Sequence, residues 1–135
     1  VQVFANYSSQ RALGDESGNF AGYVPRSASW GVSLTRPKFN VRMNCNYRGR
    51  QRGNRIAAGS SIEPGTYNWA LERLFLDLSG EYYFRRKLAV FASARNVTGG
   101  LNDAEVAGPS TPGGTRLRQR TDIGALWTIG LKGSF

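Results

Sequence analysis

The sequence has no histidine and only one cysteine, and these absences remove most metal and nucleophile chemistry. Without histidine, the common zinc ligand sets and the Ser-His-Asp and Cys-His catalytic arrangements cannot be assembled from this chain. The lone Cys45 leaves no partner for an internal disulfide. No P-loop, GxGxxG motif or metal-spaced acidic loop occurs either. The sequence therefore predicts no enzyme, no cofactor and no metal site.

Long apolar runs are also absent. The longest, Leu88 to Ala92, has five residues, whereas a membrane-spanning helix needs about 20. No basic segment followed by an apolar one opens the sequence. A helical membrane protein is thereby excluded.

Positive charge is in excess, with 18 Lys and Arg against 9 Asp and Glu in 135 residues. Such a balance suits a phosphate-bearing partner, either a nucleic acid or a membrane surface. The basic residues are dispersed, however, and the densest stretch, from Arg48 to Arg55, has no aromatic RNA-binding pattern beside it. We expect no nucleic-acid partner, but a soluble basic β-sheet module that binds nucleic acid or acidic polysaccharide remains an alternative.

Alternation of apolar and polar residues predicts about six long strands. The clearest is 39–48, where Phe39, Val41 and Met43 begin an apolar face and Asn40 and Arg42 a polar one. The facing of 88–97 is not decided by its pattern, because Leu88, Val90 and Ala92 stand opposite another apolar residue, Phe91. The expected strands are 1–9, 29–35, 39–48, 73–84, 88–97 and 120–135.

The connections between these strands alternate strictly between long and short. Segments 10–27, 49–70 and 98–118 are long and rich in Gly, Pro, Ser and Asn, whereas 36–38 and 85–87 are tight turns. Long loops at one end and short turns at the other are typical of outer-membrane barrels. Aromatic residues also stand toward the ends of apolar faces, as Phe39 and Tyr47 do, which favours a barrel with aromatic girdles over a soluble sandwich.

Three segments carry a resemblance to a known family: Leu76–Phe84 (LDLSGEYYF), Leu88–Val97 (LAVFASARNV) and Trp127–Phe135 (WTIGLKGSF). Together they resemble the C-terminal end of a TonB-dependent outer-membrane receptor, whose last strands read similarly and end in an aromatic residue. The stretches 20–30 and 46–50 are similar to strand and loop edges of such receptors. Single motifs of this kind are weak, but their order and the terminal Phe135 are more specific.

The resemblance implies an all-β, antiparallel meander that forms an open segment of a transmembrane β-barrel. Residues 1–135 are then the C-terminal six-strand portion of a receptor for energised uptake of a scarce ligand, without its plug and earlier strands. The implied partners are outer-membrane lipid, lipopolysaccharide, the barrel-assembly machinery and, through the missing parts, the TonB system. The implied location is the outer membrane of a Gram-negative bacterium, and the ligand is left open. A small autonomous outer-membrane barrel is a further alternative.

The resemblance also assigns roles to individual residues. Trp127, Ile129, Leu131 and Phe135 resemble the family's barrel-assembly signal, an apolar row on an edge strand. We expect lumen-facing charges at Arg42, Arg73, Asp77, Glu81 and Asp122, and a solvated extracellular rim at Arg48, Arg50, Arg52 and Arg55. The loop acids Asp15, Glu16, Asp103 and Glu105 would belong to the external vestibule.

Asp77 and Glu81 are the only pair that invites a catalytic interpretation. They stand four residues apart on one strand, about 13 Å along it, whereas a glycosidase carboxylate pair requires about 5 to 9.5 Å. Structural ion pairing is therefore favoured. The chain as a whole should form an open curved sheet with unpaired edges at residues 1–9 and 120–135, and a dry core around Trp127, Ile129 and Leu131 would contradict the membrane interpretation.

Overall fold

The computed structural model describes residues 1–11, 13 and 21–133, and it is all-β with antiparallel pairing throughout. Six strands form the larger sheet in the order β1-β2-β3-β6-β7-β10, and four form a second sheet in the order β4-β5-β8-β9. The predicted all-β, antiparallel class is confirmed. Phe135, Asp15 and Glu16, named above, lie outside the described residues.

The six-stranded sheet contains five of the predicted strands with small shifts of their bounds, and its sixth strand covers only the later part of the predicted 120–135. Each strand pairs with its neighbour in an antiparallel register that is continuous except for a shift between Tyr83 and Arg85 in the β6–β7 pair. The bounds are Gln2–Ser9 (β1), Arg26–Arg36 (β2), Phe39–Arg48 (β3), Arg73–Arg85 (β6), Leu88–Arg95 (β7) and Leu126–Gly133 (β10). In the described part of the chain, β1 pairs only with β2 and β10 only with β7, so the sheet is open with the two edges that the sequence predicts.

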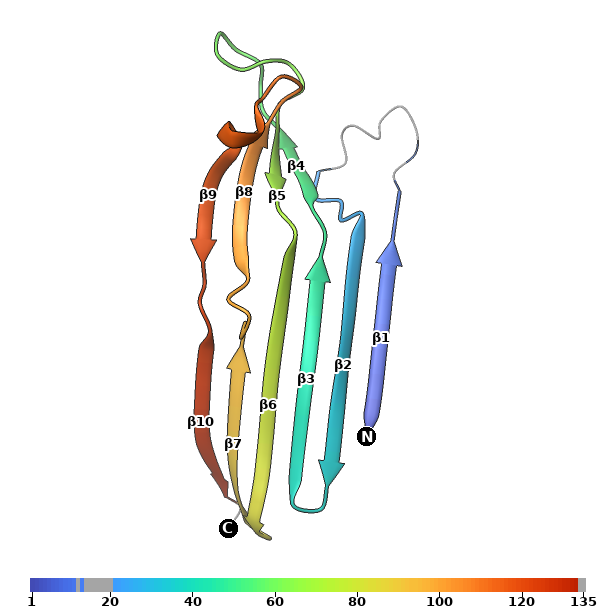
Figure 1. Cartoon of the computed structure of the whole chain (residues 1–135), viewed down its shortest axis with the longest axis vertical. Coiled ribbons are helices and arrows are strands. Elements are labelled where there is room, and N and C mark those ends of the chain that lie inside the picture. Colours follow the sequence, from blue (N-terminus) through green and yellow to red (C-terminus); the bar gives the residue numbers. More distant parts are fainter. Residues whose placement is uncertain (12, 14–20, 134–135) are drawn as a thin grey trace.

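The four-stranded sheet corrects the expectation that 49–70 and 98–118 are loops. These segments hold the strands Gln51–Arg55 (β4), Tyr67–Ala70 (β5) and Leu101–Ala107 (β8), and β9 follows at Leu117–Asp122 after the short 3-10 helix Gly113–Thr115. Tyr67, Trp69 and Val106 are of residue types that favour strands. They continue strand pairing past the end of the six-stranded sheet. Figure 1 shows this second sheet beyond the ends of β3, β6 and β7, at the end opposite the tight turns.

The last predicted strand, 120–135, is also corrected, because it breaks between β9 and β10. Gly124 has a φ of 65°, a conformation that glycine adopts without strain. Its main-chain N–H donates to the Asp122 carboxylate at 2.9 Å, which closes the break as a local turn. Asp122 therefore caps this break, a role that the alternating pattern did not predict.

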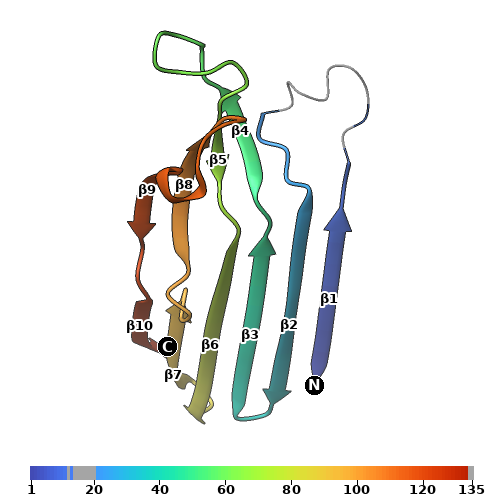
Figure 2. The same cartoon turned by 45° about the horizontal axis from the view of Figure 1, so that its top comes forward.

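Among the described residues, no second layer covers the six-stranded sheet. In Figures 1 and 2 no other described element lies across its strands, and the extensive contacts of each strand are with its sheet neighbours. The buried apolar residues of the described chain are all small: Cys45, Ala89, Ala94 and Ala107. Ordinary domains bury apolar residues between two layers, so this sheet has no dry core of its own. Among the described residues, no helix is long and apolar enough to cross a membrane.

Candidate functional site

The register places the apolar residues of six strands on one face of the larger sheet. Residues directly opposite in a ladder point to the same side. Met43 stands opposite Val32 and Leu78, Leu78 stands opposite Ala94, and Ala94 opposite Trp127. The same reasoning settles strand β7, whose Val90, Ala92 and Ala94 belong to this side. We call it the apolar face: Val3, Ala5, Tyr7, Ala28, Trp30, Val32, Leu34, Phe39, Val41, Met43, Cys45, Tyr47, Leu74, Leu76, Leu78, Tyr82, Val90, Ala92, Ala94, Trp127, Ile129 and Leu131.

Rings stand at both ends of the apolar face. Phe39 pairs with Tyr82 beside the tight turns, and Tyr47 shares its row with Tyr7 at the other end. The row through Val41 is aliphatic, whereas the rows above it also contain Trp30 and Trp127. The predicted bracketing of aliphatic residues by Phe39 and Tyr47 is therefore found along β3, whereas Trp30 and Trp127 lie in rows between the two ends of the face.

The apolar face is open to its surroundings. On the edge strand β10, Trp127, Ile129 and Leu131 are 66%, 76% and 74% exposed. Contiguous apolar surface of this extent on a protein marks a contact with lipid or with another protein. These three residues form the apolar row that the sequence predicts on an unpaired edge.

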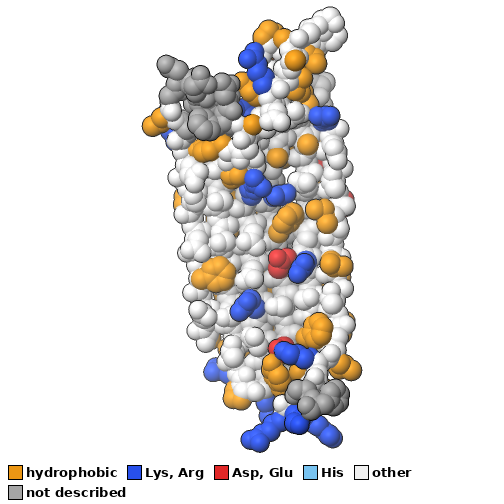
Figure 3. Space-filling view, turned by 180° about the vertical axis from the view of Figure 1, so that it is seen from behind, with side chains coloured by type: hydrophobic (Ala, Val, Ile, Leu, Met, Phe, Trp, Pro, Cys, Tyr) orange, Lys and Arg blue, Asp and Glu red, His pale blue; other side chains and the backbone are white. Residues whose placement is uncertain are grey.

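The opposite face is polar, with Asn40, Arg42, Asn44 and Asn46 along β3. Figure 3, which views the molecule from behind, shows a surface of mostly polar and backbone atoms with scattered charged and apolar side chains. Phe4 and Phe91, two of the aromatic residues that interrupt this face, lie against glycines. A Cβ on Gly130 would lie 2.5 Å from Phe91 Cζ, and one on Gly31 would lie 2.6 Å from Phe4 Cε1. Covering a glycine in this way protects its backbone within a strand.

The predicted lumen-facing charges lie on this polar face or at its breaks, and all of them except Arg42 make structural contacts. Glu81 accepts a bond from Lys132 Nζ at 3.2 Å. Asp77 accepts one from the main-chain N–H of Asn96 at 3.0 Å. Arg73 donates to Asn102 at 3.1 Å and lies over the ring of Phe75. Arg42 is exposed opposite Ser33 and Ser79.

Asn96 joins the two sheets, and the sequence analysis missed its role. It has a φ of 52° and is buried. Its side-chain N–H groups donate to the carbonyls of Gly100 and Gly124 at 3.2 and 3.0 Å, and its Oδ1 accepts from the N–H of Gly100 at 2.8 Å. The signal was present in the sequence as a turn-forming Asn followed by Gly99 and Gly100.

The predicted rim arginines lie along the second sheet and its junction. Arg50 Nη2 bonds Glu105 Oε2 at 2.9 Å, and its guanidinium lies 4.2 Å from the ring centre of Trp69. Arg52 lies over Tyr67 at 4.8 Å. Arg48 donates to Gln51, and Arg55 is exposed at the end of β4. Three of the four are therefore held by neighbouring side chains.

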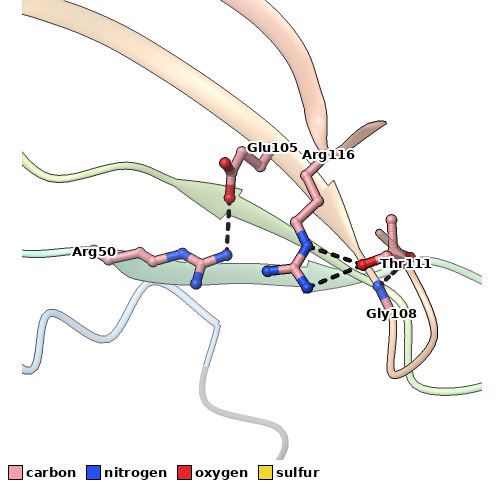
Figure 4. Close-up of polar contacts among 5 residues, drawn as sticks. All are labelled: Arg50, Glu105, Gly108, Thr111 and Arg116. Atoms are coloured by element: carbon pink, nitrogen blue, oxygen red, sulfur yellow. Dashed lines mark hydrogen bonds and ion pairs between the residues drawn. The ribbon is translucent and has the colours of Figure 1, made fainter. Parts of the chain in front are cut away.

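Polar contacts close to the rim arginines hold the loop that precedes β9. Figure 4 shows the Arg116 guanidinium donating twice to the carbonyl of Thr111, at 3.0 and 2.9 Å, while the Thr111 hydroxyl accepts from the N–H of Gly108. The Glu63 carboxylate accepts from the N–H of Ser110 at 2.8 Å. Bonds from Ser110 and Thr111 lower the pKa of Glu63 from its ordinary value. Asp103 takes a forked bond from Arg120, with its shortest distance 2.8 Å.

No group of His, Cys, Asp and Glu that could hold a metal ion occurs among residues 1–11, 13 and 21–133. Asp77 and Glu81 are engaged with different partners, Asn96 and Lys132, which agrees with structural contacts rather than with a paired role. No protein-family model, curated protein or solved structure matches the chain. Functional inference therefore rests on the two faces of the sheet and on the resemblance noted above.

Proposed function

We propose that this chain is the C-terminal part of the barrel wall of a TonB-dependent outer-membrane receptor, which takes up a scarce ligand. The observation that carries the proposal is the apolar face, which extends over six antiparallel strands and which no other described element covers, while the other face is polar. A barrel wall has this division, with lipid on one side and a wet lumen on the other.

The lengths of three of the six strands support the same proposal. A tilted membrane strand needs about 9 to 11 residues; β2, β3 and β6 contain 11, 10 and 13, whereas β1, β7 and β10 contain 8 each. Rings at both ends of the apolar face suit the two headgroup levels of a bilayer. In this arrangement the tight turns face the periplasm and the second sheet extends the wall beyond the outer leaflet.

Individual residues take roles within this proposal. Trp127, Ile129 and Leu131, with Phe135, form the assembly signal on an edge strand whose open N–H and C=O groups accept another strand. Arg42, Arg73, Asp77 and Glu81 line the lumen. The second sheet, with Arg50, Arg52 and Glu105, forms the extracellular rim near which ligand and lipopolysaccharide would bind.

The test is refolding of the chain from urea with and without phosphatidylcholine vesicles, followed by circular dichroism and protease protection. We expect β structure and protection only when vesicles are present, because the apolar face requires lipid. A folded monomer in buffer, with steeply salt-dependent binding to duplex DNA or an acidic polysaccharide, would instead establish the soluble basic module.

A further inference from the structure

The end of the larger sheet that holds the tight turns carries five cations close together. The β2–β3 turn and the β6–β7 turn are neighbours, because the main-chain N–H of Tyr83 donates to the carbonyl of Lys38 at 2.7 Å. Figure 3 shows Lys and Arg side chains gathered at this end of the molecule. We call the group the cationic turn end; its members, all exposed, are Arg36, Lys38, Arg85, Arg86 and Lys87.

These five side chains have no partners within the described residues. None of them makes a side-chain hydrogen bond, an ion pair or a ring contact there. The acid on the adjoining part of β6, Glu81, already bonds Lys132. At the other end of the molecule, by contrast, Arg50 and Arg120 are each neutralised by a carboxylate. Within the described part of the chain, no anion neutralises the charge of the cationic turn end, so this charge can attract an external anion.

The cationic turn end adjoins the apolar face directly. Arg36 stands opposite Phe39, and Phe39 stands opposite Tyr82. A cation therefore lies in the same cross-strand row as the rings at this end of the apolar face. Tyr82 and Phe84 are both about half exposed. A long basic side chain beside rings at the edge of an apolar surface is suited to the headgroup level of a bilayer, with its stem in the apolar layer and its charge among the phosphates.

We propose that the cationic turn end binds the phosphates of anionic phospholipids at the bilayer surface. This inference rests on the proposed membrane role of the apolar face, and it adds a preference for one lipid charge at one end of the sheet. A cation close to an anionic surface strengthens binding by about fivefold. Five unpaired cations side by side therefore favour a leaflet rich in anionic phospholipid over a zwitterionic one.

The test compares binding of the full chain to phosphatidylcholine vesicles with and without added phosphatidylglycerol, at low and high salt. We expect tighter binding to the anionic vesicles, and a loss of at least about tenfold in that preference for the double variant R86Q/K87Q. The matched control R11Q/R118Q removes two cations from the opposite end of the molecule and should keep the preference. Both variants change exposed side chains, and circular dichroism checks that each folds.

The outcomes separate this inference from the proposed function. Insertion into neutral vesicles with no effect of phosphatidylglycerol, or of R86Q/K87Q, overturns the inference and leaves the barrel proposal standing. Binding to anionic vesicles that R86Q/K87Q weakens, but without insertion, supports the inference and overturns the barrel proposal. Equal weakening of binding to duplex DNA by R86Q/K87Q would show a general polyanion site and overturn the assignment to phospholipid.

Discussion

The two sheets of the molecule are continuous along the chain, yet different interactions stabilise them. The six-stranded sheet has a long regular ladder and an apolar face that nothing in the described chain covers. The four-stranded sheet is short and irregular, and arginines bonded to Glu105 and Asp103 or stacked on Trp69 hold it together. Among the described residues, the first sheet therefore has no layer packed on its apolar face, whereas the second sheet has its own polar contacts.

The largest effect is expected from a charge in the middle of the apolar face. Met43→Arg places a guanidinium between Val32 and Leu78, and such a change on a lipid-facing surface costs about 2 to 4 kcal/mol. The measurement is the fraction of chain that folds with phosphatidylcholine vesicles. The matched control is Asn46→Arg, on the polar face of the same strand, and equal losses in both variants would contradict the assignment of the faces.

The junction between the sheets should be next in size. Asn96→Ala removes three side-chain hydrogen bonds at a buried position, and leaving their partners unsatisfied costs about 2 kcal/mol in the free energy of unfolding. Urea unfolding of the chain folded in vesicles measures this loss in the free energy of unfolding. Asn96→Gly keeps the positive φ without strain, so a stability equal to that of the wild type would show that only the backbone conformation matters.

Breaking an ion pair of the second sheet should have a smaller effect. Glu105→Gln removes the charge that faces Arg50 at a partly exposed pair, and such pairs contribute about 0.2 to 1 kcal/mol. The difference in urea midpoint between variant and wild type should shrink at high salt because screening weakens the pair. Arg55→Gln, at an exposed arginine, serves as the control. If it lowers the stability as much as Glu105→Gln does, the result argues against the pairing of Arg50 with Glu105.

The smallest effect concerns the loop held by Glu63. Its pKa is lowered from the ordinary 4.5 because its carboxylate accepts bonds from Ser110 and Thr111. A lowered folded-state pKa means that this contact stabilises the loop above pH 4.5 and is lost as the pH falls through the folded value. The amide resonance of Ser110 should therefore titrate below pH 4.5 in the wild type and not in Glu63→Gln. Titration at or above the ordinary value would contradict the contact.

Five of the six strands of the larger sheet were predictable because an alternating pattern is local information, whereas the break within 120–135 was not. Apolar and polar residues alternate without a break from Phe39 to Arg48, so the sequence of this strand alone shows which residues share a face. The strands of the second sheet were not predictable in this way. Tyr67 to Ala70 spans four residues, too few for a period to be visible, and its pairing depends on β4 and β8, which are distant in sequence.

The candidate site was predictable to a similar degree. The apolar row of Trp127, Ile129 and Leu131 follows from alternation alone, and the register adds its neighbours. The partners of Arg50 and Asp77 required the fold, because Glu105 and Asn96 lie far from them in sequence. Asp122 was assigned to the lumen by alternation, but the break at Gly124 gives it a capping role that a strand pattern cannot encode.

The most direct test of the membrane role uses the three tryptophans, which the fold places in different surroundings. Trp30 and Trp127 belong to the apolar face, whereas Trp69 lies in the second sheet under Arg50. Variants that keep one tryptophan each, folded with vesicles of brominated lipid, should show strong quenching at Trp30 and Trp127 and little at Trp69. Equal, weak quenching of all three would contradict the account, because the apolar face would then not contact lipid.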